Sequence, residues 1–203
     1  MYYFLCILIG YLLGCISPSY ILGKIMGIEL RGGGTKNLGA SNSFIHLGRG
    51  LGALVMLFDI FKAFFAAHIC SRLSIDLPLA GIVAGSACVL GHNYPFYLGF
   101  KGGKGLACYG GLALWVSPSL FLVLLVASLF LALIFNYGCV VAISAAVLFP
   151  FLSFVKFKSL AVFFILAACS ASVLIKHTEN LRRIQRGEET KFRAFIGKYI
   201  LKR

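Results

Sequence analysis

LFLVLLVASLFLALIF, residues 120–135, is the stretch that decides the fold class, because it contains no charged side chain. LAVFFILAACSASVLI, residues 160–175, is a second run of the same kind. Transmembrane strands alternate apolar and polar residues, whereas these runs are continuous and favour helices that satisfy their own backbone in lipid. Composition agrees: 60% of the 203 residues are hydrophobic and 12% are charged, against about 25% charged residues in soluble domains. The sequence therefore predicts an all-α, polytopic membrane protein.

The apolar runs predict about seven transmembrane helices, since a helix needs about 20 residues to cross the hydrocarbon core. Turn signals at Ser117-Pro118 and Asn136-Tyr137-Gly138 separate runs that would otherwise merge. The N-terminal run lacks a basic leader and a small-residue cleavage pattern, so it is interpreted as the first span. The expected spans are residues 3–27, 51–70, 78–94, 105–117, 119–135, 139–155 and 159–175.

The net charge of +13 is concentrated in the connectors and the C-terminal tail. When the connectors are assigned alternately to two sides, one side holds only Arg72, Lys156 and Lys158 of the nineteen basic residues. Lys and Arg accumulate on the cytoplasmic side of membrane proteins. The C-terminus is therefore expected inside and the N-terminus outside. The basic charges are expected to attract anionic membrane lipids, and no nucleic acid is expected because no base-stacking module accompanies them.

Polar residues inside the spans are few. Seven cysteines lie in or beside the apolar runs without CxxC or Cys/His spacing, so they are interpreted as packing residues rather than as metal ligands or disulfides. Asp59 and Lys62 lie three residues apart on one helix face and are expected to pair. Their positions leave open whether this pair is structural or functional.

Two glycine-rich connectors have the composition of anion-binding loops. Loop one, residues 29–42, reads ELRGGGTKNLGASN, and its successive glycines allow backbone N–H groups to converge on an anion. Loop two, residues 91–105, reads GHNYPFYLGFKGGKG and precedes an apolar helix. A phosphate at that helix N-terminus would gain from N–H groups and the helix dipole. Loop two is not a Walker A loop, because it lacks that spacing and the Lys-Ser/Thr pair.

Loop three, residues 176–191, reads KHTENLRRIQRGEETK. In a helix, His177 and Asn180 share one face. The basic and apolar residues from about 176 onward predict an amphipathic tail at the membrane surface. Because all three loops lie on the same predicted side, we expect them to assemble one phosphate-handling site on the cytoplasmic face.

The three loops together resemble the integral-membrane, acyl-phosphate-dependent glycerol-3-phosphate acyltransferases of bacteria. GHNYPFYLGFKGGKGLA (91–107) and HTENLRRIQRGEE (177–189) carry the resemblance, which extends over nearly the whole chain. It implies one transmembrane domain over residues 1–203 in the bacterial inner membrane, with no metal or cofactor. It also implies transfer of a fatty acyl group from acyl phosphate to the sn-1 hydroxyl of glycerol 3-phosphate, an early step in phospholipid biosynthesis.

The resemblance also implies roles for single residues. Lys104 takes the position of the phosphate-binding lysine, and His177 and Asn180 take those of the polar pair in the third motif; these three are the candidate catalytic residues. Thr35 takes the position of a serine in the first motif. The other candidates for substrate or phosphate binding are Asn37, Asn42, Arg49, His92, Lys101, Gly102, Gly103 and Glu188.

Loop one departs from the family pattern. Thr35-Lys36-Asn37 replaces the usual Ser-Gly-Asn, and Ile45 stands where the family has an arginine that is expected to hold a substrate phosphate. His46, Lys36 and Arg49 are candidates to compensate. Two alternatives to acyl transfer therefore stay open: a transporter of an anionic phosphorylated metabolite, and a lipid-binding paralogue with altered catalysis.

The expected mechanism is positioning and charge neutralisation, because acyl phosphate is already activated. Lys104, Thr35 and the Gly102–Gly103 amides are expected to hold the acyl-phosphate head group. Glycerol 3-phosphate is expected to be oriented by Asn42, His177 and Asn180. Since no Ser-His-Asp or Cys-His set is visible, a substrate phosphate oxygen is favoured over His177 as the base.

Overall fold

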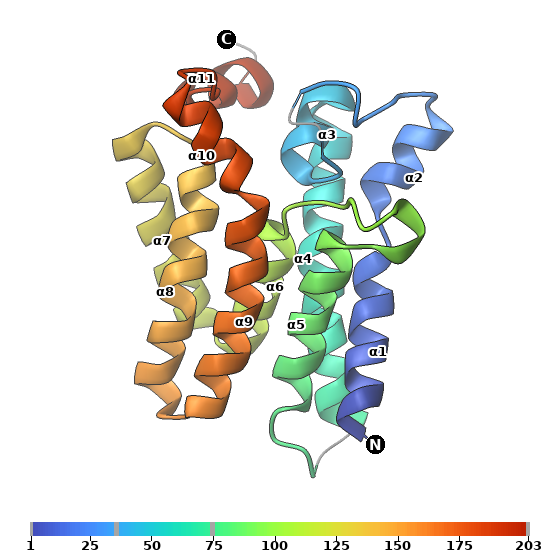
Figure 1. Cartoon of the computed structure of the whole chain (residues 1–203), viewed down its shortest axis with the longest axis vertical. Coiled ribbons are helices and arrows are strands. Elements are labelled where there is room, and N and C mark those ends of the chain that lie inside the picture. The colour runs from blue at the N-terminus through green and yellow to red at the C-terminus, as the bar shows by residue number, and fades with distance from the viewer. Residues whose placement is uncertain (1, 35–36, 74–75, 202–203) are drawn as a thin grey trace. The chain divides into compact units, whose positions relative to one another are not determined.

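The structure is a computed structural model that describes residues 2–34, 37–73 and 76–201. In these ranges every regular element is helical, which confirms the all-α prediction. The chain forms two compact units, Met1–Val116 and Ser117–Arg203 (Figure 1). The first unit contains α1 (Tyr2–Cys15), α2 (Pro18–Ile25), α3 (Ala40–His46), α4 (Gly48–Leu73), α5 (Ala80–Asn93), η1 (Phe96–Leu98) and α6 (Leu106–Val116). The second contains α7 (Pro118–Phe135), α8 (Cys139–Phe157), α9 (Leu160–Lys176), α10 (Thr178–Gln185), α11 (Phe192–Phe195) and η2 (Ile196–Leu201).

Each expected span coincides with helical structure, although not every helix is long enough to cross a bilayer. Among the described residues, four segments have the length and hydropathy of a membrane span, namely Tyr2–Ile25, Gly48–Leu73, Pro118–Phe135 and Cys139–Phe157. The bent pair α9–α10 would make a fifth. Helices α5 and α6 have 14 and 11 residues. The structure therefore agrees with an integral membrane protein, and the count of seven crossings stays a prediction.

The first span is broken between α1 and α2. Pro18 has no N–H, so the carbonyl of Gly14, four residues earlier, has no helical donor. The N–H of Tyr20, the helical donor for Ile16, turns instead to Ser17 Oγ at 3.4 Å. Non-helical backbone at membrane depth needs partners inside the protein, and the ammonium of Lys62 on α4 supplies them. It donates to the carbonyl oxygens of Gly14 and Ile16 at 3.1 and 2.8 Å.

Close packing of α1 against α5 depends on glycine. A Cβ atom added to Gly10 would lie 2.1 Å from the carbonyl oxygen of Ala84, and one added to Gly14 would lie 2.1 Å from that of Cys88. Small residues one turn apart allow membrane helices to approach in this way. The backbone of α1 is therefore held directly against α5, the helix that leads into loop two.

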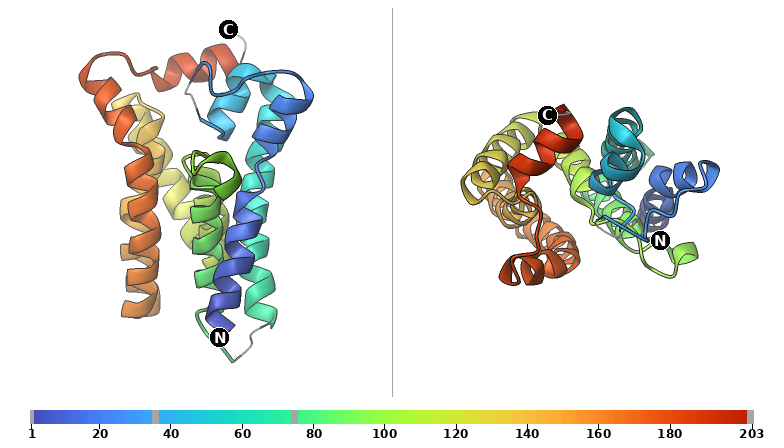
Figure 2. Two further views of the ribbon diagram at one scale, coloured as in Figure 1. Left: turned by 45° about the vertical axis from the view of Figure 1, so that its right-hand side comes forward. Right: turned by 90° about the horizontal axis from the view of Figure 1, so that it is seen from above.

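In the second unit, α7, α8 and α9 pack as neighbours, and the view along the helices shows them grouped (Figure 2). The tail contacts the α7–α8 connector: the N–H of Phe192 donates to the carbonyl oxygen of Asn136 at 2.9 Å. At the α6–α7 junction, Lys156 Nζ donates to Ser117 Oγ at 2.5 Å. Within this unit, segments predicted on one side of the membrane therefore lie together.

The seven cysteines are all buried, and none of them forms a disulfide bond. This agrees with their interpretation as small packing residues.

Candidate active site

Loops one and two lie together in the first unit and share a small apolar core. Leu30 and Leu38 of loop one are buried with Leu98 of loop two. Above this core, Arg31 Nη2 donates to the carbonyl oxygen of Lys101 at 2.7 Å. The expectation that these two loops are neighbours is therefore confirmed.

Asparagine side chains hold the backbone of loop one. Asn42 is fully buried, and its Nδ2 donates to the carbonyl oxygen of Leu30 at 2.5 Å. Asn37 Oδ1 accepts from the N–H of Gly39 at 3.0 Å, just before α3. Arg49 is exposed in the first turn of α4. Direct contacts of these three residues with substrate stay predictions.

Thr35 and Lys36, two positions on which the sequence interpretation of loop one depends, lie outside the described residues.

His46 faces the glycine stretch of loop one from the last position of α3. Its Nε2 atom is buried and has no hydrogen-bond partner among the described residues. A Cβ atom at Gly34 would lie 2.9 Å from this nitrogen, and one at Gly33 would lie 3.2 Å from His46 Cε1. His46 and Arg49 are the described candidates to replace the family arginine. The side chain of His46 contacts loop one, which favours His46.

The glycines of loop two pack directly against His92. The N–H groups of Gly102 and Gly103, which the sequence predicts to bind phosphate, donate instead to the carbonyl oxygens of Asn93 and His92 at 3.2 and 3.0 Å. A Cβ atom at Gly103 would lie 2.0 Å from His92 Nε2. These glycines are required because there is no room for a side chain between the loop and the histidine.

The cations of loop two are placed beside the start of α6. Lys101 is exposed, and Lys104 is half-buried two residues before α6 begins at Leu106. The first turn of a helix has N–H groups without intrahelical acceptors. Lys104 and this turn together form a local positive site, and the binding of an anion there stays a prediction.

A buried charge cluster lies beneath loop two. Asp59, Lys62 and His92 are 1%, 6% and 5% exposed. The ion pair between Lys62 Nζ and Asp59 Oδ1 measures 2.7 Å, which confirms the expected pair. His92 Nδ1 lies 3.0 Å from Lys62 Nζ and 3.3 Å from Asp59 Oδ1. Asp59, His92 and Cys108 have the composition of a metal-ligand group, but the Lys62 ammonium already provides a cation beside the carboxylate.

Loop three belongs to the second unit and begins at the 41° bend between α9 and α10. His177 is 4% exposed, and its Nδ1 lies 2.8 Å from the carbonyl oxygen of Val173. A carbonyl only accepts, so Nδ1 carries hydrogen and the neutral ring has its lone pair on Nε2. His177 is thereby set up to accept a hydrogen bond through Nε2.

Asn180 is held by a carboxylate that the sequence interpretation missed. Its Nδ2 donates to Glu189 Oε1 at 2.7 Å, and Arg183 Nε donates to Glu189 Oε2 at 2.6 Å. Glu188, the candidate chosen from sequence, is exposed and lies 4.0 Å from Arg186. Gly187, with φ of +75°, turns the chain back toward α10. In the sequence, Gly187 was the signal that the chain turns here and that a following residue contacts α10. It did not show whether Glu188 or Glu189 makes that contact.

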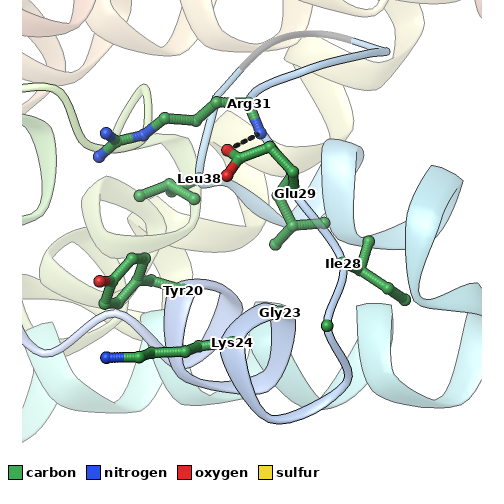
Figure 3. Close-up of a pocket in the computed structure, with 9 residues that line it drawn as sticks. Tyr20, Gly23, Lys24, Ile28, Glu29, Arg31 and Leu38 are labelled. Carbon is green, nitrogen blue, oxygen red and sulfur yellow. Dashed lines mark hydrogen bonds between the residues drawn. The ribbon is translucent and has the colours of Figure 1, made fainter.

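A cavity of about 360 Å³ opens beside loop one, between α2 and the chain that follows it. The ammonium of Lys24, the guanidinium of Arg31 and the hydroxyl of Tyr20 lie on the same side of it (Figure 3). The single carboxylate, Glu29, accepts from the N–H of Arg31 at 3.2 Å. Two cations against one anion make the cavity positive. The sequence interpretation missed Tyr20 and Lys24 because they fall inside an expected span.

Comparison with known proteins decides the family. The family model described as "Glycerol-3-phosphate acyltransferase" matches residues 4–187. Similar curated proteins include the glycerol-3-phosphate acyltransferase of Fusobacterium nucleatum, 33% identical over 95% of this chain and 100% of that protein. The glycerol-3-phosphate acyltransferase 1 of Oceanobacillus iheyensis is 35% identical over 98% of this chain and 99% of its own. This chain belongs to the glycerol-3-phosphate acyltransferase family.

Solved structures agree with this assignment to the acyltransferase family. The crystal structure of PlsY, an integral membrane glycerol 3-phosphate acyltransferase, in its glycerol 3-phosphate form has a TM-score of 0.87. It is 33% identical and the match covers 94% of this chain and 95% of that one. The lysophosphatidic acid form has a TM-score of 0.85 at 31% identity, with 99% of both chains covered. The acyltransferase fold therefore spans both units of this chain.

The contact between loop two and His92 is open to a direct test. Gly103→Ala places a methyl group against the His92 ring and must displace the loop that carries Lys104. A displacement of about 1 Å can lower the rate of a positioned reaction about 100-fold, so we expect kcat/KM for acyl transfer to fall by about that factor. Gly197→Ala is the matched control, because a Cβ atom there meets open space. Equal activity of the two variants would contradict this role of Gly103.

Proposed function

We propose that this protein transfers a fatty acyl group from acyl phosphate to the sn-1 hydroxyl of glycerol 3-phosphate, releasing lysophosphatidic acid and phosphate. The observation that supports this most is the family match over residues 4–187, which includes loops one and two and loop three as far as Gly187. The similarity to a PlsY structure in its glycerol 3-phosphate form supports the same acceptor. Family membership also favours an enzyme over a transporter of phosphorylated metabolites.

We further propose that the two units act as one transmembrane domain with seven crossings in a bacterial inner membrane. The distribution of Lys and Arg supports an outside N-terminus and a cytoplasmic C-terminus. In this arrangement loop three joins loops one and two in a single site at the cytoplasmic surface. Membrane lipids surround the site and receive the acylated product.

The mechanism that we propose relies on charge and position. Lys104 and the first turn of α6 bind the acyl-phosphate head group and neutralise its charge. On the acceptor side, His177 Nε2 accepts a hydrogen bond from the sn-1 hydroxyl, while Glu189 keeps Asn180 oriented toward glycerol 3-phosphate. The hydroxyl oxygen attacks the acyl carbon, the bond from that carbon to the phosphate oxygen breaks, and the leaving phosphate takes the hydroxyl proton. In this step the acyl group, the leaving phosphate and the proton are all accounted for by the two substrates.

We assign the task of the missing first-motif arginine to His46. Ile45 at the family position is apolar, whereas the His46 ring lies against Gly33 and Gly34 of loop one. The buried Nε2 of His46 can donate a hydrogen bond to an oxygen of a substrate phosphate bound beside loop one. This bond would satisfy Nε2, whose burial without a partner costs free energy.

The activity is tested by supplying the purified protein with palmitoyl phosphate and radiolabelled glycerol 3-phosphate. We expect labelled lysophosphatidic acid, and we expect Lys104→Ala to lower kcat/KM at least about 100-fold, since charge stabilisation in a closed site contributes about 3 kcal/mol or more. Lys198→Ala, at an exposed lysine of the tail, is the control. Full activity of Lys104→Ala would remove the centre of the mechanism, and flux of glycerol 3-phosphate into liposomes without product would favour a transporter.

If His46 binds a substrate phosphate, replacing it should weaken substrate binding without reducing the amount of folded protein. His46→Ala should raise the KM of a phosphorylated substrate about 10-fold, corresponding to one lost hydrogen bond to a charged group. Ile45→Arg added to His46→Ala should recover part of this loss, because it restores a cation at the family position. Unchanged KM values in His46→Ala would rule out this role and direct attention to Arg49 and Lys36.

A further inference from the structure

Lys62 has more neighbours than it has hydrogens. Four polar atoms surround its Nζ: Asp59 Oδ1 at 2.7 Å, the Ile16 carbonyl oxygen at 2.8 Å, His92 Nδ1 at 3.0 Å and the Gly14 carbonyl oxygen at 3.1 Å. An ammonium group offers only three N–H donors. Its three hydrogen bonds go to the carbonyl oxygens of Gly14 and Ile16 and to His92 Nδ1, and Asp59 Oδ1 is its ion-pair partner.

The contact with Lys62 assigns the protonation of His92. An ammonium group cannot accept a hydrogen bond, so the contact of 3.0 Å makes His92 Nδ1 the acceptor and puts the hydrogen of the neutral ring on Nε2. The ammonium of Lys62, which is itself paired with Asp59, thereby fixes both the tautomer and the orientation of the ring. The opposite edge of the ring, Nε2, is the edge that lies against Gly103.

Loop two is attached both to His92 and to the break between α1 and α2 that Lys62 contacts. At its C-terminal end, the His92 carbonyl accepts from the N–H of Gly103 at 3.0 Å, one residue before Lys104. In the middle of the loop, the hydroxyl of Tyr97 donates to the carbonyl oxygen of Cys15 at 2.8 Å. Burial raises the pKa of the Tyr97 phenol, so this donor keeps its hydrogen at neutral pH.

Stability alone is a weak reason for this cluster. A buried ion pair pays a large desolvation penalty, and apolar side chains of similar volume often replace such a pair without loss of stability. Ionisable residues within membrane helices are therefore read first as functional. Here the charges contact both the helix break and the histidine on which loop two rests.

We propose that Asp59 and Lys62 are positioning residues for acyl transfer. They act through His92 and through the α1–α2 break, and they hold loop two so that Lys104 meets the phosphate of the substrate. The inference rests on the proposed phosphate-binding role of loop two. Neither residue touches the substrate itself.

The test separates positioning from folding by measuring KM and Vmax together with inhibition by inorganic phosphate. Lys62→Met keeps an unbranched apolar stem and removes the ammonium group with its three donors. Asp59→Asn keeps the shape of the carboxylate and removes its charge. In both variants we expect the KM for acyl phosphate and the inhibition constant of inorganic phosphate to rise at least about 10-fold, the size of one lost hydrogen bond to a charged group. Lys156→Met is the matched control at a lysine of the second unit and should leave both constants unchanged.

A purely structural role predicts a different result. Less folded enzyme would lower Vmax and leave the KM and the inhibition constant as they are, and that outcome would overturn the proposal. If Lys62→Met cannot be purified, Tyr97→Phe removes one hydroxyl from the same attachment, and it should raise both constants in the same direction by a smaller factor. Constants unchanged in Tyr97→Phe and Asp59→Asn would equally overturn the proposal.

Lys104→Ala in the same assay separates this inference from the proposed function. If Lys104→Ala raises the inhibition constant while the Asp59 and Lys62 variants do not, loop two binds phosphate and the positioning proposal alone is wrong. If Lys104→Ala leaves the constant unchanged, the phosphate-binding role of loop two and the positioning proposal both fail.

Discussion

A proline in the middle of an apolar span sets the constraint on which the first unit depends. Pro18 cannot donate a hydrogen bond, so the carbonyls before it need donors from elsewhere. A buried carbonyl left without a donor costs about 1–3 kcal/mol, and the break between α1 and α2 contains more than one carbonyl that lacks its helical donor. The Lys62 ammonium, brought by α4, donates to the carbonyls of Gly14 and Ile16. The same ammonium pairs with Asp59 and lies beside His92 of α5, so one charge connects three helices.

This connection extends from the buried charges to loops one and two. Loop two rests on His92 without space for a Cβ atom, and loops one and two share the Leu30, Leu38 and Leu98 core. Such a rigid base suits a reaction in which the donor is already activated and the enzyme supplies mainly position and charge. Loop three shows the same design in the second unit, where Val173 fixes the hydrogen on His177 and Glu189 holds Asn180.

The sequence was most informative where structure is decided locally. The expected spans match helices within three residues at their ends, because transfer of continuous apolar runs into lipid is a property of each run. The Asp59–Lys62 pair was predictable from its three-residue spacing. The contacts of Lys62 with Gly14, Ile16 and His92 were not, because these residues lie 30 to 48 positions away in the chain. The amides of Gly102 and Gly103 were assigned to phosphate for the same reason: their acceptors, the carbonyls of His92 and Asn93, become apparent only when the loop folds back.

Hydrogen–deuterium exchange of the wild-type protein and of Lys62→Met, in the same detergent, measures the central connection most directly. If one ammonium holds the helix break and loop two together, amides in residues 13–21 and 99–109 exchange faster in the variant, while those of α8 are unchanged. Faster exchange confined to α4, or none at all, would contradict the idea that Lys62 joins these segments.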